Sequence, residues 1–230
     1  EGDTKLSGPG FDVSGASGKY DASLDLDTPE SVDVSLTHEL NDQWTLIASI
    51  TALRDIPSLV VGCPSRGDDA AMMLRTMMAL AKVDGRVCAF LEPIALYMTK
   101  DLYEAGDGGW LTAYPTPDRA IPLGEGRVYA PEDGSAGEDL VIFTFGNGVP
   151  MSLRAARTIQ AEQGWSVRVV DLRWLLPLNE AAIARHAAEC ARILVVDEGR
   201  RSAGVGEGII TAVVEAGLGA TPLRRVVGAD

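Results

Sequence analysis

From Asp139 to Val170 the sequence reads DLVIFTFGNGVPMSLRAARTIQAEQGWSVRVV, and this stretch decides the fold. A short apolar run, Leu140–Phe145, is followed by a helical pattern over Pro150–Gln163 and by a second apolar run, Ser166–Val170. Apolar runs that alternate with helices are typical of a parallel β-sheet covered by helices. Gly164 stands where a helix commonly ends. The stretch therefore predicts a strand, a helix and a parallel strand.

The same alternation continues to the end of the chain. It predicts a helix over Asn179–Ala191, a strand over Ile193–Val196 and a last helix over Gly206–Ala216. Leu-Pro-Leu at 176–178 ends a strand and leaves Asn179 to cap the helix that follows. Residues 138–230 are therefore expected to form an open, doubly wound α/β domain.

A smaller α/β unit is expected upstream, at residues 52–98. Leu59–Gly62 is predicted as a buried strand, and Asp68 and Asp69 stand where the cap of the helix Ala70–Ala81 belongs. Val87–Leu91 is predicted as a second, parallel strand. Residues 99–137, rich in Gly, Pro, Asp and Glu, are predicted to be a linker between the two units.

Residues 1–51 have a different pattern. Apolar and polar residues alternate over residues 20–26 and 32–50, with Asn41-Asp42 as a turn signal, and this predicts a β-hairpin. Residues 1–50 contain ten acidic residues and two lysines, which puts −8 of the net charge of −13 there. We interpret this segment as one of different origin.

The composition excludes several classes of protein. A net charge of −13 argues against a nucleic-acid partner, because phosphate binding needs clustered cations. The cysteines, Cys63, Cys88 and Cys190, are widely spaced, so we expect buried thiols rather than disulfides or a zinc site. No apolar run reaches the ~20 residues of a membrane helix. Because the chain starts at Glu1 with no secretory signal, we expect a fragment from the cytoplasm.

Several stretches, taken in order, resemble the beta subunit of the thiamine-diphosphate-dependent first component of 2-oxo acid dehydrogenase complexes. They are Ile56–Val61 with Pro64-Ser65 and Asp69-Ala70, Phe90–Pro93 with Leu96-Tyr97, Asp171–Leu178, and Val195–Gly199 with Gly204-Val205-Gly206. The resemblance covers residues 52–230. It implies part of a pyrimidine-binding α/β domain followed by a transketolase C-terminal-like domain.

The resemblance also implies what the chain lacks. The family's catalytic glutamate would precede Ile56, and the alpha half of the enzyme binds the diphosphate and its magnesium. We therefore expect no catalytic and no cofactor-binding residue here, although the complete enzyme uses thiamine diphosphate and Mg²⁺. The implied partners are the alpha half, a second beta subunit and the lipoyl acyltransferase core. The fragment would then serve as an interface and docking domain rather than as a catalyst.

Four residues remain as candidates for a site. Some relatives bind a monovalent cation at the position of Asp84, and this is the one metal site that the resemblance implies; a simple turn with Gly85 is the reading we favour. His38 and His186 are expected to be structural, since neither lies in a catalytic motif. Glu92, at the end of a strand, is expected to pair with an arginine or lie in an interface.

Two glycine-rich turns admit a binding role. Gly204–Gly208 could be a dinucleotide fingerprint, but no acidic ribose ligand follows in a second unit. Gly146-Asn147-Gly148 could hold an anion at a helix start. We favour a structural interpretation for both turns.

Other functions stay open. The chain could come from another transketolase-like enzyme, such as a transketolase or a ketoacid-ferredoxin oxidoreductase. Residues 20–51 also resemble a strand pair of the outer-membrane long-chain fatty acid transporters, through Thr28–Val32 and Leu40–Leu46. On that basis the chain would be a chimera joined near Thr51-Ala52. A third hypothesis is therefore that the chain is the remnant of an outer-membrane transporter fused to part of an enzyme.

Overall fold

The computed structural model describes residues 56, 58–131, 134–199 and 201–228. The hairpin predicted for residues 1–51, and His38 within it, lie outside the described residues. The larger part of the described chain forms a five-stranded sheet in the order β3-β5-β4-β7-β8. Its strands are β3 (Arg127–Tyr129), β4 (Leu140–Thr144), β5 (Val167–Asp171), β7 (Ile193–Asp197) and β8 (Leu223–Val227).

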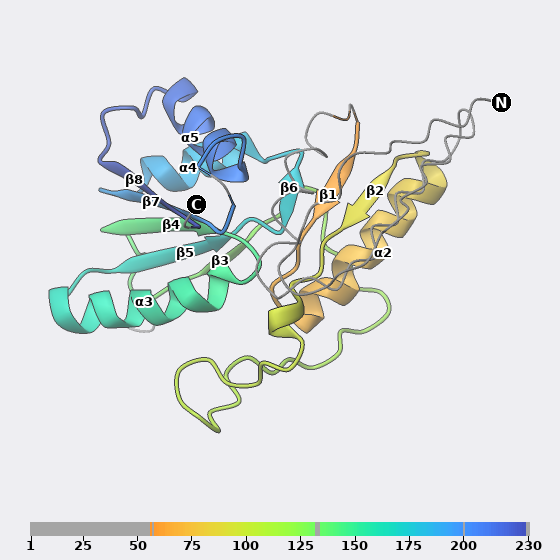
Figure 1. Ribbon diagram of the computed structural model, residues 1–230, viewed down its shortest axis with the longest axis horizontal. Coiled ribbons are helices and arrows are strands. Elements are labelled where there is room, and N and C mark those ends of the chain that lie inside the picture. The colour runs from red at the N-terminus through yellow and green to blue at the C-terminus, as the bar shows by residue number, and fades with distance from the viewer. Residues whose placement is uncertain (1–55, 57, 132–133, 200, 229–230) are drawn as a thin grey trace, which may run out of the picture. The chain divides into compact units, whose positions relative to one another are not determined.

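This sheet is parallel except at one edge. β4 lies between β5 and β7 and is parallel to both, β7 is parallel to β8, and β3 pairs antiparallel with β5. The connections are α3 (Gly148–Gln163), α4 (Glu180–Ala188) and α5 (Val205–Glu215). Figure 1 shows α3 on one side of the sheet and α4 and α5 on the other. The predicted doubly wound α/β domain is confirmed.

The alternation along β4 sorts its side chains into the two cores. Val141 and Phe143 pack with residues of α4 and α5, whereas Leu140 and Ile142 pack with Val149 and other residues of α3. All five side chains are nearly or fully buried. A strand that is apolar on both faces is what a sheet covered on both sides requires.

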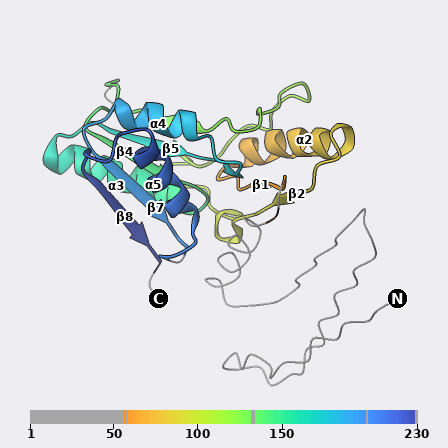
Figure 2. The same cartoon turned by 90° about the horizontal axis from the view of Figure 1, so that it is seen from above.

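A second sheet of three strands has the order β2-β1-β6. β1 (Val60–Gly62) is parallel to β2 (Cys88–Phe90) and antiparallel to β6 (Trp174–Leu176). The helix α2 (Gly67–Val83) connects β1 to β2 and lies along both strands, as Figure 2 shows, and a 3-10 turn, η1 (Ile94–Leu96), follows β2. β6 comes directly after β5, so the chain passes from one sheet to the other at residues 171–174.

Local signals in the sequence explain how the helices end. Gly164 closes α3 in the left-handed conformation at φ 68°, which an L-residue with a side chain adopts reluctantly. The side chain of Asn179 accepts a hydrogen bond from the backbone N–H of Ala182 and so caps α4. β6 ends at Leu176, before Pro177. These predictions are confirmed.

Two features differ from the sequence-based expectation. Asp68 and Asp69 do not cap α2, because the helix already begins at Gly67 and both residues lie in its first turn. The strands β3 and β8 were not predicted, only the end of β6 was, and β3 lies within the predicted linker 99–137. The same segment contributes Leu102 and Trp110 to the core under α3 and Ile121 to the core under α2. The division at 51, 98 and 137 stays a prediction.

Candidate functional site

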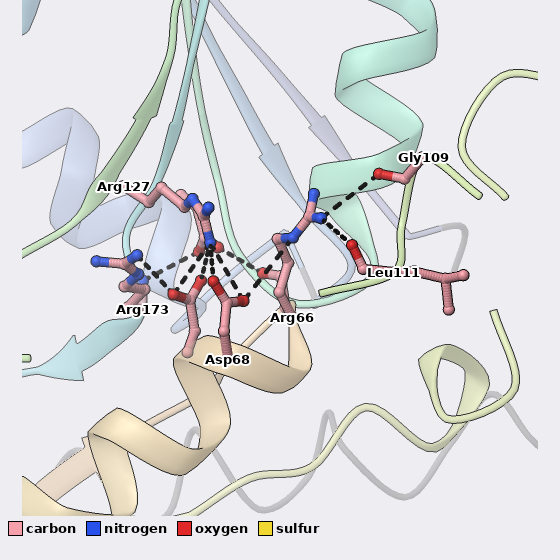
Figure 3. A network of polar contacts seen from close by, with 9 residues as sticks. Arg66, Asp68, Gly109, Leu111, Arg127 and Arg173 are labelled. Atoms are coloured by element: carbon pink, nitrogen blue, oxygen red, sulfur yellow. Dashed lines mark hydrogen bonds and ion pairs between the residues drawn. The ribbon is translucent and has the colours of Figure 1, made fainter. Parts of the chain in front are cut away.

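A cluster of ion pairs lies where the two sheets meet. Its centre is Asp69, whose side chain is fully buried in the first turn of α2. Asp69 Oδ1 accepts hydrogen bonds from Arg173 Nη2 at 2.7 Å and from Arg127 Nη1 at 3.1 Å. Arg127 Nη1 also donates to Asp68 Oδ2 at 3.2 Å. Asp68, Asp69, Arg127 and Arg173 are called the Asp69 cluster below, and Figure 3 shows its side chains converging.

The members of the cluster come from elements far apart in the sequence. The aspartates belong to α2, Arg127 opens β3, and Arg173 lies in the turn between β5 and β6 at φ 58°. Carboxylates in the first turn of a helix are favoured by its dipole, which explains their place in α2. The cluster therefore fastens α2 to the edge of the five-stranded sheet.

A second carboxylate, Asp171, lies at the end of β5 and is also fully buried. Its Oδ2 accepts a hydrogen bond from Ser65 Oγ at 2.6 Å, and its Oδ1 accepts one from the backbone N–H of Arg173 at 3.1 Å. Burial raises the pKa of Asp171 to about 7, and Asp69 adds to this, while Ser65 and Arg173 oppose it. Asp171 is therefore a buried acid that titrates near neutrality.

The Cys63 thiol lies close to Asp171. Cys63 follows β1 and is fully buried. Burial, together with the charges of Asp171 and Glu198, raises the pKa of the Cys63 thiol far above its usual range. A thiol that stays protonated is neither a nucleophile nor a metal ligand. Cys63 is thus a packing residue.

A cleft of about 510 Å³ lies beside the Asp69 cluster. One wall is formed by the start of α2, with Asp68, Asp69 and Met72. Arg127 and Arg173 line it from the sheets, and residues 112–116 with Arg119 form the opposite wall. The charged side chains of the inner wall are already paired with one another.

The two glycine-rich turns are occupied by the chain's own groups. At the start of α5 the backbone N–H of Gly206 donates to Asp197 Oδ2 at 2.7 Å, and Gly199 donates to the other oxygen at 2.8 Å. At the start of α3 the N–H groups of Gly148 and Val149 donate to carbonyl oxygens of the preceding turn, and Pro150 has no N–H to offer. The structural interpretation of both turns agrees with this geometry, because oxygens of the chain itself accept from the N–H groups of Gly206, Gly148 and Val149.

Asp84 lies apart from the Asp69 cluster. It is exposed at the end of α2, its backbone N–H donates to Leu80 O at 3.1 Å, and Gly85 follows at φ 65°. This geometry is the simple turn of Asp84 with Gly85 that the sequence analysis favours. The monovalent cation site at Asp84 stays a prediction. Among the residues that the structure describes, no three His, Cys, Asp or Glu side chains are grouped so as to hold a metal ion.

The other candidates also have structural surroundings. His186 is buried, and Arg168 Nη1 lies 3.0 Å from its Nδ1. Burial, with Arg185 and Arg168 nearby, lowers the pKa of His186, so the neutral ring is favoured. Glu92 is exposed and accepts a hydrogen bond from the hydroxyl of Tyr97; its expected place beside an arginine or in an interface stays a prediction.

The free cysteines differ in burial. Cys63 and Cys190 are buried as predicted, whereas Cys88 is half-buried. Its thiol lies 3.6 Å from the carbonyl oxygen of Met77, and burial raises its pKa.

Sequence reasoning missed the members of the Asp69 cluster as partners. Asp-Leu-Arg at 171–173 directly after a strand was a usable signal, because charged residues there must either face a ligand or find a buried partner. The sequence gives no hint that the partner is Asp69, which lies 104 positions away.

The geometry agrees with comparisons to known proteins. A model of the transketolase C-terminal domain family matches residues 129–230, a range that starts in β3 and runs through the five-stranded sheet. Residues 129–230 are a transketolase C-terminal domain. The resemblance of this part of the chain to transketolase-like enzymes is confirmed.

Relatives with known names match a longer stretch. The chain is 31% identical over 157 residues to "3-methyl-2-oxobutanoate dehydrogenase subunit beta" of Mycobacterium tuberculosis, which is 68% of this chain and 39% of that protein. It is 33% identical over 172 residues to "1-deoxy-D-xylulose-5-phosphate synthase" of Anaeromyxobacter dehalogenans, 73% of this chain and 24% of that protein. The mitochondrial "Pyruvate dehydrogenase E1 component subunit beta-1" of Arabidopsis thaliana is 29% identical over 183 residues, which is 76% of this chain and 44% of that protein. The chain thus spans less than half of the length of each of these relatives.

A solved structure supports the fold. The chain titled "Split gene transketolase, inactive beta4 tetramer" superposes with a TM-score of 0.59 at 22% identity, over 80% of this chain and 53% of that one. The match extends the likeness from the transketolase C-terminal domain to most of the described residues.

The comparisons give no support to the outer-membrane resemblance of residues 1–51, which lie outside the described residues. Within the part of the chain that the structure describes, no helix has the length and apolar character needed to cross a membrane.

Proposed function

We propose that this chain supplies the transketolase C-terminal domain, with part of the preceding pyrimidine-binding domain, to a thiamine-diphosphate-dependent enzyme. In the finer form of the proposal, the complete enzyme oxidatively decarboxylates a 2-oxo acid and transfers the acyl group to lipoyl. The observation that carries the proposal is the family match over residues 129–230 together with beta-subunit relatives at 29–31% identity.

We expect that the described residues do not hold thiamine diphosphate. A diphosphate needs free backbone donors or cations, and a helix start is the usual place for them. Here Asp197 occupies the start of α5, and turn carbonyls occupy that of α3. Arg127 and Arg173 are paired with Asp69. No catalytic step is therefore assigned to these residues.

The role that fits them is structural. A transketolase C-terminal domain that is fastened to α2 by buried ion pairs offers a rigid body for contacts between subunits. On this proposal the partners are an alpha half, a second beta subunit and a lipoyl acyltransferase core. The location proposed for such an enzyme is the cytoplasm.

The synthase relatives favour a second candidate, because their identity to this chain is as high as that of the dehydrogenases. On this alternative the domain belongs to another transketolase-like thiamine enzyme. A domain exchange separates the two. Residues 129–230 would replace the corresponding domain of the Mycobacterium tuberculosis beta subunit and, separately, that of the Anaeromyxobacter dehalogenans synthase.

We expect the dehydrogenase chimaera to keep activity with its own alpha subunit and the synthase chimaera to lose it. Activity only in the synthase chimaera would transfer the assignment to the alternative. For the chain alone we expect no heat of binding when thiamine diphosphate is titrated in the presence of Mg²⁺. A micromolar affinity measured by calorimetry would contradict the absence of a cofactor site.

A further inference from the structure

Residues 111–120 form one wall of the cleft beside the Asp69 cluster, and their two ends are anchored in different cores. Before the segment, Trp110 is 4% exposed and packs into the core under α3. After it, Ile121 is also 4% exposed and packs into the core under α2. The segment itself is mostly exposed, with Pro115 buried in its middle. It therefore spans from one core to the other along the cleft.

Both ends are held firmly. At the first end the Arg66 guanidinium lies 4.6 Å from the centre of the Trp110 ring and donates to Leu111 O at 3.1 Å. Figure 3 shows Arg66 between Asp68, with which its Nε pairs at 3.9 Å, and the carbonyl oxygens of Gly109 and Leu111. At the other end Thr76 Oγ1 donates to Ile121 O at 2.6 Å. These contacts leave the middle of the segment to be fixed separately.

A single side chain of α2 holds that middle part. Arg75 Nη1 donates to Thr116 O and to Arg119 O, both at 2.6 Å, and Arg75 Nη2 donates to Pro115 O at 3.2 Å. Its guanidinium also lies 5.6 Å from the centre of the Tyr114 ring. Hydrogen bonds from a charged donor are stronger than those between neutral groups.

The backbone bonds of the segment are local by contrast. The N–H of Arg119 donates to Thr116 O, and that of Leu111 donates to Gly108 O. Neither bond reaches α2 or a strand. A segment with fixed ends, local turns and one polar attachment in the middle has a natural mode of opening, in which the attachment is released and the ends stay in place.

We infer that residues 111–120 are a lid over the cleft, and that the hold of Arg75 on the carbonyl groups of residues 115, 116 and 119 keeps it closed. This inference does not depend on the proposed function. When Arg75 releases these carbonyls, the segment swings away from α2 about its ends at Trp110 and Ile121. Met72, which is 7% exposed and lines the cleft, then becomes accessible.

Tryptic cleavage of the full chain tests the closed state. Trypsin needs a stretch of chain that is free to enter its active site, and the carbonyl of its scissile bond Arg119-Ala120 is one that Arg75 holds. In Arg75→Ala we expect this cut to be at least tenfold faster than in the unchanged chain. Arg75→Lys keeps the charge but loses the forked donor, so its rate of cleavage after Arg119 should lie between those of Arg75→Ala and the unchanged chain. Lys82→Ala, also on α2, is the control and should have no effect.

Cleavage after Arg154, inside α3, reports unfolding of the domain and should stay slow throughout. If Arg75→Ala does not fold, Arg75→Lys carries the test, with an expected rise of about threefold. An unchanged rate at Arg119 in a folded variant overturns the inference.

Access to the cleft is tested by labelling Met72→Cys with N-ethylmaleimide and locating the label by mass spectrometry. We expect the labelling rate to rise at least tenfold when Arg75→Ala is added and to stay constant when Lys82→Ala is added. Faster cleavage at Arg119 without faster labelling at position 72 would show that the segment loosens without uncovering the cleft, and it would overturn the lid.

Discussion

Replacement of Asp69 by asparagine tests the energetic role of the Asp69 cluster. The side chain of Asp69 is fully buried, and Arg173, whose side chain is 7% exposed, has Asp69 as its ion-pair partner. Asp69→Asn therefore leaves the buried guanidinium of Arg173 without a carboxylate partner. Breaking a buried pair from one side costs about 3–5 kcal/mol. For a domain of this size, each kcal/mol lowers Tm by roughly 2–4 °C.

We therefore expect Asp69→Asn to lower Tm by roughly 6–20 °C. The free energy of unfolding is measured by urea titration, followed by tryptophan fluorescence, to which Trp174, 1% exposed, contributes. Asp68→Asn is the matched control. Asp68 is 18% exposed and pairs with the 31% exposed Arg127 and, at 3.9 Å, with Arg66; neither arginine is fully buried, so its loss should cost about 1 kcal/mol or less.

The double variant Asp69→Asn/Arg173→Met removes the stranded charge. Its free energy of unfolding should be higher than that of Asp69→Asn alone, because replacing a buried ion pair by apolar residues costs little stability. Equal unfolding free energies for Asp69→Asn and Asp68→Asn, or a double variant as unstable as the sum of its parts, would refute the reasoning.

Three further predictions concern single residues. The pKa of Asp171 is raised from 3.8 to about 7, so between these pH values the native state keeps a proton that the unfolded chain has released. The free energy of unfolding should therefore fall by on the order of 4 kcal/mol as the pH rises from about 4 to 7. Urea titrations should show a flatter pH dependence for Asp171→Asn. In Gly148→Ala the new Cβ would lie 2.1 Å from the hydroxyl of buried Thr144, so the free energy of unfolding should be lower by about 1–3 kcal/mol. Gly219→Ala, whose new Cβ would have its nearest neighbour at 3.9 Å, should be close to neutral, and equal stabilities of the two variants would contradict this. In native protein at pH 8, iodoacetamide should modify half-buried Cys88 before buried Cys63, and mass spectrometry that finds the reverse order would refute the burial argument.

The sequence predicted the elements whose signals are local. β4, α3, β5, α4, β7 and α5 each carry a complete apolar run or helical period, and Gly164 and Asn179 mark helix ends through their own backbone or side-chain chemistry. The parallel pairing followed from the alternation of strands and helices. These elements needed no knowledge of distant residues.

The missed elements depend on distant partners. β3 pairs with β5, and β6, of which only the end was predicted, pairs with β1, so both are strands because of partners that lie far away in the sequence. β8 carries Arg224 and Arg225 in its middle, which is unusual for a core strand but suits the edge position beside β7. For the same reason the sequence indicated charged residues at Asp69 and Arg173 but not their contact.

The carboxylate of Asp197 has a consequence for how such sequences are recognised. It lies at the end of a strand and neutralises the positive end of the next helix, so any incoming phosphate would have to displace an anion tethered a few residues away. Asp197 precedes Gly204 by seven positions, and its carboxylate reaches the N–H of Gly206 at the start of α5. Val-Asp-Glu at 196–198 and Gly-Val-Gly at 204–206 thus form a turn that supplies its own anion.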